Sequence, residues 1–330
     1  MDDILQINDL TVRFETDDGI LTAVDSVSLG IRKGEVLGLV GESGSGKSVT
    51  ALSILRLIPS PPGRIESGQV LYEGQDLLRL PIRELRKFRG SRISMIFQEP
   101  MTALSPLHRI GNQMVETLRL HENMARPDAI RRSIEWLGKV GMPDPEQRMR
   151  SYPYQLSGGM RQRVMIAMAL MLSPALVIAD EPTTALDVTI QAQIFDLIIE
   201  MKQDDTSVLL ITHDMGVIWE MCNRVAVMYA SEIVETAPIE ALFARPAHPY
   251  TEALLASMPA LDSPRSRLEH IPGNVPSALD YPSGCHFRER CRYAAQRCER
   301  QHPSLYPTSG GNARCFKSDP KDPLTESIDA

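Results

Sequence analysis

The chain has 330 residues, of which 43% are hydrophobic and 23% charged, and its formal net charge is −7. This composition is ordinary for a globular protein, and the length allows two or three domains of roughly 100–200 residues each. The negative charge argues against a protein that holds nucleic acid by bulk charge. No run reaches the ~18 apolar residues needed to cross a bilayer, and the N-terminal MDDILQIND lacks the regions of a signal peptide. We therefore expect a cytosolic chain whose link to any membrane passes through a partner.

Strand and helix patterns alternate along most of the chain. Residues 4–14 and 20–32 alternate apolar and polar side chains, which predicts antiparallel strands. Residues 35–40 read as a short buried strand, and residues 48–57 have helical spacing that closes at a group of prolines. Further strands are expected at residues 69–75, 92–97, 176–179 and 208–211, a helix at 190–201, and a hairpin of 225–230 with 232–236. Because strands alternate with helices, the sequence predicts an α/β fold with a mostly parallel sheet.

The composition divides the chain into three regions. Residues 99–160 are polar and helical in pattern, which predicts a helical subdomain between the two parts of an α/β core, 1–98 and 161–245. Residues 246–330 are rich in proline and hold four of the five cysteines. We expect this last region to be a small, loop-rich C-terminal appendix.

A glycine-rich loop is the first motif that carries chemistry. Residues 41–48 read GESGSGKS and fit G-x-x-x-x-G-K-[ST], between a predicted strand and a predicted helix. The glycines let successive backbone N–H groups face phosphates, and the helix N-terminus adds a favourable dipole. Lys47 is expected to bridge the β- and γ-phosphates of a bound nucleotide and Ser48 to bind Mg²⁺. The alternative is a turn with a chance match. The predicted nucleotide-binding residues of this loop are Gly41, Ser43, Gly44, Ser45, Gly46, Lys47 and Ser48.

Polar side chains follow three of the predicted strands. Asp180 and Glu181 end the strand LVIA, where a buried carboxylate is costly unless it holds a cation or a proton. Asp180 is the natural outer ligand for Mg²⁺, and Glu181 can polarise an attacking water. The alternative is a helix N-cap pair. His213 and Gln98 also end strands, and ligands bind at the carboxyl ends of parallel strands. The alternatives are a structural histidine and a polar loop residue.

The segment LSGGMRQR, residues 156–163, precedes the Asp180 strand and opens a helix. Together with the phosphate loop, Gln98, the Asp180–Glu181 pair, the segment 185–187 (ALD) and His213, it resembles the motif set of an ABC-type ATPase, in family order. The resemblance covers residues 4–240 and implies a P-loop ATPase core with an antiparallel β subdomain and a helical subdomain.

The resemblance also implies a role for each matching residue. Phe14 would stack on adenine, where the alternative is a core aromatic at a strand end. Gln98 would sense Mg²⁺ and the attacking water. Ser157 and Gly159 would contact the γ-phosphate of ATP held by an opposite subunit, and Asp187 would communicate between the two sites. Two such chains would therefore sandwich two ATP molecules, with Lys47, Gln98, Glu181 and His213 as the catalytic set and Ser48, Gln98 and Asp180 around Mg²⁺.

The C-terminal appendix narrows the resemblance. The segments HPYT (248–251) and IPG (271–273), followed by a cysteine cluster, closely resemble the ATPases of oligopeptide and dipeptide importers, most of all the D-type subunit. This implies an F-type partner chain or a homodimer, two membrane-spanning permeases, an extracytoplasmic peptide-binding protein, and a place on the cytoplasmic face of the cell membrane. Alternatives are an importer of nickel or another small solute, and a soluble ABC ATPase that acts on nucleic acid.

Four cysteines, Cys285, Cys291, Cys298 and Cys315, have the spacing C-x5-C-x6-C-x16-C. Four thiolates can hold Zn²⁺ or an iron–sulfur cluster. The spacing is looser than that of zinc knuckles, and some relatives with this pattern carry a [4Fe–4S] cluster, so a cluster is favoured over zinc. Free thiols or disulfides remain open. Six arginines between residues 288 and 314 are expected to favour thiolates. Cys222 is interpreted as a core residue.

Overall fold

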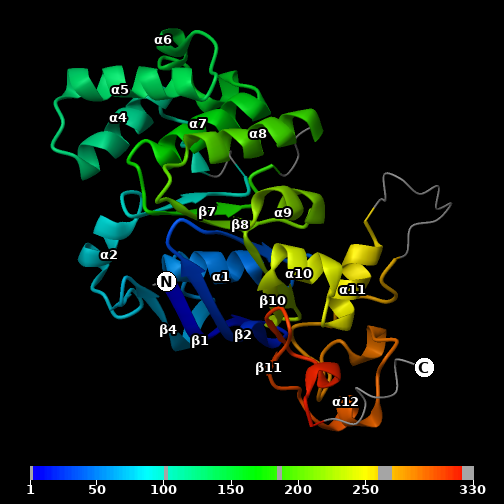
Figure 1. The fold of residues 1–330 in the computed structure, drawn as a ribbon. Helices are drawn as coiled ribbons and strands as arrows, with labels where there is room; N and C mark the ends of the chain where they lie inside the picture. Colours follow the sequence, from blue (N-terminus) through cyan, green and yellow to red (C-terminus); the bar gives the residue numbers. More distant parts are fainter. Residues whose placement is uncertain (1–2, 100–102, 184–187, 259–269, 322–330) are drawn as a thin grey trace. The chain divides into compact units, whose positions relative to one another are not determined.

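The computed structural model describes residues 3–99, 103–183, 188–258 and 270–321 (Figure 1). The chain forms two compact units, one of residues 79–211 and the other of residues 3–78 together with 212–330. The helical region and the strands next to it therefore belong to one unit, and the phosphate loop and the C-terminal region to the other. The three-part division expected from the sequence is finer and stays a prediction.

An antiparallel sheet opens the unit that holds the phosphate loop. Its strand order is β2-β1-β4-β5, with β1 and β2 as a long hairpin. The strands are β1 (Asp3–Thr16), β2 (Gly19–Arg32), β4 (Gly63–Tyr72) and β5 (Gln75–Asp76). Apolar side chains of β1, such as Leu5, Ile7 and Val12, are almost completely buried, as the alternation predicts. The expected start of β4 at residue 69 is wrong, since the polar stretch GRIESG also pairs with β1.

A second set of strands in this unit carries the phosphate loop and receives the C-terminal region, in the order β11-β12-β10-β9-β3. The pair β3–β9 is parallel, and the predicted hairpin β9–β10 is antiparallel. The appendix adds strands of its own, because β12 pairs with β10 and β11 with β12. The strands are β3 (Val36–Val40), β9 (Arg224–Tyr229), β10 (Glu232–Pro238), β11 (Tyr306–Pro307) and β12 (Asn312–Ala313).

Helices of the same unit follow the loop, line the strands and form part of the C-terminal region (Figure 1, blue, olive-green, yellow and orange). They are α1 (Lys47–Ile54), α9 (Met215–Met221), α10 (Ile239–Ala244), α11 (Pro249–Ala256) and α12 (Gln296–Arg300), with short 3₁₀ turns at Arg288–Arg290 and Phe316–Ser318. Cys222 directly follows α9 and is 6% exposed, so its interpretation as a core residue is confirmed.

The other unit contains three parallel strands in the order β8-β7-β6 and the helices of the polar region. Every residue of these strands is buried, which explains why their sequences are mostly apolar and do not alternate with polar residues. The strands are β6 (Ile93–Ile96), β7 (Leu176–Asp180) and β8 (Ser207–Ile211). The helices are α2 (Ile82–Phe88), α4 (Ile110–His121), α5 (Arg126–Lys139), α6 (Pro145–Arg148), α7 (Gly158–Leu170) and α8 (Val188–Met201), with a 3₁₀ turn at Pro153–Gln155.

The predicted α/β class, with an antiparallel sheet and a separate helical segment, is confirmed. Helix α4 packs on α5, and both contact α7, so the polar region forms a helical layer of its own within its unit. In the part of the chain that the structure describes, no helix is both long and apolar enough to cross a membrane.

Candidate nucleotide-binding site

The phosphate loop runs from the end of β3 to the start of α1, as the motif predicts. Gly41 and Gly46 have φ values of 154° and 104°, which L side chains rarely adopt. A Cβ atom at Gly41 would lie within 3.0 Å of the backbone oxygen of Met228, and one at Gly46 within 3.0 Å of that of Ala23. Both positions therefore require glycine for conformation and for space.

Two buried side chains of the loop, Lys47 and Ser45, offer donor groups that suit an anion. Lys47 is 4% exposed, and its ammonium donates to the carbonyl oxygens of Gly41, at 2.8 Å, and Glu42, at 3.0 Å. The Ser45 hydroxyl is buried and has no hydrogen-bond partner among the described residues. An unpaired buried hydroxyl is costly unless a ligand satisfies it. The residues present therefore fit a phosphate group at the N-terminus of α1, where the helix dipole is also favourable.

The remaining predicted residues of this unit lie at its surface. Ser43 and Gly44 are exposed at the tip of the loop, and Ser48 is half-buried in the first turn of α1. Phe14 is half-buried on β1, opposite Gly63 of β4. His213 is exposed two residues after β8 ends. The assigned roles of these side chains stay predictions.

The other unit brings two of the predicted catalytic residues together. Asp180 is the last residue of β7 and is 4% exposed. Glu181 follows with a φ of 42°, uncommon for a non-glycine residue, and its N–H donates to Ile211 of β8 at 3.0 Å. The Gln98 amide, just beyond β6, donates to the Glu181 carboxylate at 3.2 Å. The carboxyl ends of β6 and β7 therefore share one polar cluster.

The LSGGM segment opens α7. Ser157 is the N-cap, and its hydroxyl accepts from the N–H of Met160 at 3.3 Å. Ser157 is exposed and Gly159 half-buried, so the start of the helix is available to a ligand from outside the unit. Gln162 of α7 donates to the carbonyl of Pro182, which ties this helix to the segment after Glu181. Asp187 lies outside the described residues.

The four clustered cysteines line one cavity of about 270 Å³, together with apolar residues that include Phe287 and Phe316. None of them forms a disulfide in the described structure. Burial raises the pKa of Cys285 and of Cys315 to about 12, and it also raises the pKa of Cys291. These three thiols are therefore protonated at neutral pH until a ligand displaces the protons.

The expectation that arginines favour thiolates at this cluster is wrong. The guanidinium of Arg297 pairs with Asp319, that of Arg292 with Glu252, and that of Arg290 with Glu42. Arg314 donates to the carbonyls of Ile233 and Pro303. These side chains fasten the C-terminal region by hydrogen bonds, and burial determines the thiol pKa values instead.

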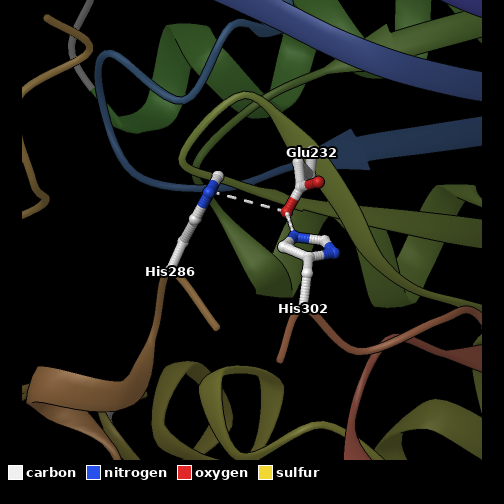
Figure 2. Close-up of side chains that lie close together, drawn as sticks. All are labelled: Glu232, His286 and His302. Atoms are coloured by element: carbon white, nitrogen blue, oxygen red, sulfur yellow. Dashed lines mark hydrogen bonds and ion pairs between the residues drawn. The ribbon is translucent and has the colours of Figure 1, made fainter. Parts of the chain in front are cut away.

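A further group of ligand-type side chains, not found from the sequence, joins the C-terminal region to β10. Figure 2 shows the Glu232 carboxylate between the rings of His286 and His302, at 3.5 and 2.9 Å. Their nearest ligand atoms lie within 4.8 Å of one another, which one divalent cation could span. The Nδ1 atom of His286 also lies 3.2 Å from the carbonyl of Ala230, so it carries a proton there. We therefore interpret Glu232, His286 and His302 as a polar cluster that anchors the C-terminal region to β10.

Ser231, next to Glu232, adds a further contact between the C-terminal region and the rest of this unit. It has a φ of 71° in the β9–β10 turn. Its hydroxyl lies 2.5 Å from that of Tyr281 and donates to the carbonyl of Thr22 at 2.7 Å. A serine here connects the C-terminal region to β2.

Known families account for most of the chain. The profile of the ABC transporter family matches residues 24–184, and that of the oligopeptide/dipeptide transporter C-terminal region matches residues 234–298. The oligopeptide transport ATP-binding protein OppD of Salmonella typhimurium is 48% identical over 316 residues, which cover 95% of this chain and 93% of the relative. AppD of Bacillus subtilis is 49% identical over 318 residues, covering 96% and 97%.

Solved structures agree with the fold. The ATP-binding cassette MJ0796, in a dimeric post-hydrolysis state with ADP and Pi, has a TM-score of 0.64 at 28% identity and covers 71% of this chain and 98% of its own. The chain belongs to the ABC transporter family, in the branch of ATP-binding proteins with an oligopeptide/dipeptide transporter C-terminal region. It is an ATPase, and the family suggested by the LSGGM and HPYT segments is confirmed.

Proposed function

We propose that this chain is the ATP-hydrolysing subunit of an ABC importer that takes up dipeptides and oligopeptides. The carrying observation is that relatives named for oligopeptide transport align over nearly the whole chain, including the C-terminal region that distinguishes the branch. The buried, unpartnered hydroxyl in a complete phosphate loop supports ATP as the energy source.

The site residues divide the work of hydrolysis. Lys47 and the backbone N–H groups of the loop hold the β- and γ-phosphates, and Ser48 and Asp180 are the proposed holders of Mg²⁺. A bound Mg²⁺ supplies neutralisation of the phosphate charge. Glu181 accepts a proton from the attacking water, and Gln98, hydrogen-bonded to Glu181, orients that carboxylate. His213 stabilises charge on the γ-phosphate.

The complete ATP site is proposed to need two chains. Ser157 and Gly159 sit at an accessible helix N-terminus, a favourable place for a phosphate from another subunit. Asp187 would link the two sites. The cassette MJ0796 is described as dimeric, which supports this arrangement. The second subunit is an F-type chain or a copy of this one, and both contact two permeases that place them on the cytoplasmic face of the cell membrane. An extracytoplasmic peptide-binding protein delivers the substrate.

We propose that the four-cysteine cavity holds a [4Fe–4S] cluster rather than zinc. A tetrahedral zinc site brings its sulfurs to about 3.8 Å from one another, given Zn–S bonds of ~2.3 Å. Among the described residues, no three of these sulfurs come within 4.8 Å of one another. A cavity of about 270 Å³ that all four cysteines line suits a larger group. Cys285, Cys291, Cys298 and Cys315 would hold it and staple a small, proline-rich region.

Uptake in living cells tests the proposed function. A strain that lacks this chain is complemented with the wild type or with Glu181→Gln, and uptake of a labelled dipeptide, a labelled tripeptide and ⁶³Ni²⁺ is measured. Peptide uptake restored only by the wild type supports the proposal. Restored nickel uptake without peptide uptake replaces the substrate, and a defect in nucleic-acid metabolism with normal uptake of all three rejects the importer.

A further inference from the structure

Glu42, the second residue of the phosphate loop, is held by the C-terminal region at two points. Its carboxylate forms a two-pronged ion pair with Arg290, at 2.7 Å from Nη1 to Oε2 and 3.0 Å from Nη2 to Oε1. Its backbone N–H donates to the hydroxyl of Tyr250 at 2.9 Å. Both partners lie more than 200 residues away in the sequence.

Arg290 is itself fixed on several sides. Its side chain is 4% exposed, whereas that of Glu42 is 32% exposed. Its Nε donates to the carbonyl of Pro272 at 2.8 Å, and its guanidinium lies over the rings of Tyr229 and Phe287. A planar guanidinium held in this way presents both N–H groups to one carboxylate in a single orientation.

Tyr250 is equally constrained. It is completely buried, and its ring packs on those of Tyr229 and Phe287, with centroids 4.6 and 5.4 Å apart. His248 caps α11, because its Nδ1 accepts from the N–H of Tyr250 at 3.0 Å. The HPYT segment thus places one hydroxyl beneath the phosphate loop.

The HPYT, IPG and cysteine segments of the C-terminal region have no role in the hydrolysis described above, but all three take part in holding Glu42. Tyr250 comes from HPYT, Pro272 from IPG, and Arg290 precedes Cys291 in the cysteine cluster. The carbonyl of Glu42 in turn accepts from the ammonium of Lys47, at 3.0 Å, and from the N–H of Ser45, at 3.2 Å. Movement of Glu42 would displace the groups that cradle phosphate.

We propose that Arg290 and Tyr250 are positioning residues for ATP binding, which act through Glu42 to hold the phosphate loop in its binding conformation. Without Arg290, the loop must be ordered when nucleotide binds. Fixing the backbone of one further residue corresponds to roughly tenfold in affinity. Because the loop holds ATP in the ground state and in the transition state alike, KM for ATP rises while kcat stays nearly unchanged.

Affinity for Mg-ATP, measured by titration of the full chain, tests the proposal. The variants are Arg290→Met, which keeps an apolar stem on the rings, Arg290→Lys, Glu42→Gln, and the double variant that combines Arg290→Met with Glu42→Gln. We expect about tenfold weaker binding for Arg290→Met, a similar loss for Glu42→Gln, and partial rescue by lysine. The double variant should bind Mg-ATP no more weakly than the weaker-binding single variant, since both changes break the same ion pair.

Arg224 provides a matched control. It forms an ion pair at 3.0 Å with the buried Glu35, which lies in the same unit just before β3, at the end of that strand opposite to the loop. Arg224→Met is expected to lower the melting temperature and to leave ATP affinity within twofold. Wild-type affinity in both Arg290→Met and Glu42→Gln would overturn the proposal, as would an equal loss in Arg224→Met. Glu42→Gln leaves the cysteine segment intact, so the test holds even if Arg290→Met fails to fold.

Discussion

Two glycines of the phosphate loop give a matched pair of substitutions, Gly46→Ala and Gly44→Ala. Both residues have positive φ, at 104° and 82°. A Cβ atom at Gly46 would lie within 3.0 Å of the Ala23 carbonyl oxygen, whereas at Gly44 nothing lies within 4 Å. Gly44→Ala therefore adds backbone strain alone, about 1–2 kcal/mol. Gly46→Ala adds the same strain and forces the loop away from β2.

The two costs translate into different affinities for ATP. The free loop relaxes away from the strain, so the cost appears when nucleotide restores the binding conformation. We expect Gly44→Ala to weaken Mg-ATP binding by about tenfold. At Gly46 the close contact adds about 1–3 kcal/mol of overpacking to that strain. A total cost of about 3 kcal/mol corresponds to a loss of over a hundredfold. Titration of the purified chain measures both. Equal effects at the two positions, or no effect at Gly46, would refute the reasoning from contact.

Three further predictions concern the catalytic carboxylate, the cysteine cavity and a buried histidine. Glu181→Gln is expected to keep ATP affinity within about threefold and to lower hydrolysis at least a hundredfold, in a phosphate-release assay; normal turnover would remove its role as base. Anaerobic reconstitution should load about four irons and four sulfides per chain and should release protons in unbuffered solution. Cys291→Ser should abolish the loading and the proton release. One zinc per wild-type chain, without iron, would contradict the proposed cluster. Burial lowers the pKa of His248 from 6.5 to about 3. Because the unfolded chain then binds a proton more readily than the folded one, the free energy of unfolding is highest above pH 6.5 and falls as the pH drops towards 3. Between about pH 7.5 and 5.5, the free energy of unfolding of the wild type should fall by about 1.4 kcal/mol more than that of His248→Asn. Urea unfolding followed by Trp219 fluorescence measures it, with Trp136→Phe present in both proteins. An equal dependence of the unfolding free energy on pH in the two proteins would contradict the prediction.

The sequence predicted correctly those parts of the site whose conformation depends on residues close together in the chain. The loop of residues 41–48 and the start of α7 depend on glycines, a cap and a neighbouring strand, all within a few residues. The same holds for β7 and the Asp180–Glu181 pair that follows it. Short apolar runs and motif spacing were sufficient there, because each element's conformation follows from its own residues.

Contacts made across long sequence separations could not be predicted. The pair of Arg290 with Glu42 spans 248 residues, and a charge near a cysteine is read from sequence as a partner of that cysteine. In the folded chain, these arginines form ion pairs with carboxylates and hydrogen bonds with carbonyl oxygens instead. The addition of β12 to β10 was missed for the same reason, since a two-residue strand carries no periodic signal.

The proposed importer function requires that peptide and ATP hydrolysis are coupled. The direct test is ATP hydrolysis by the assembled transporter in vesicles, with and without peptide presented by its binding protein. We predict that peptide stimulates hydrolysis and that Glu181→Gln abolishes the stimulated rate. Hydrolysis that does not change with peptide but is stimulated by nickel or by nucleic acid would contradict the proposed peptide importer.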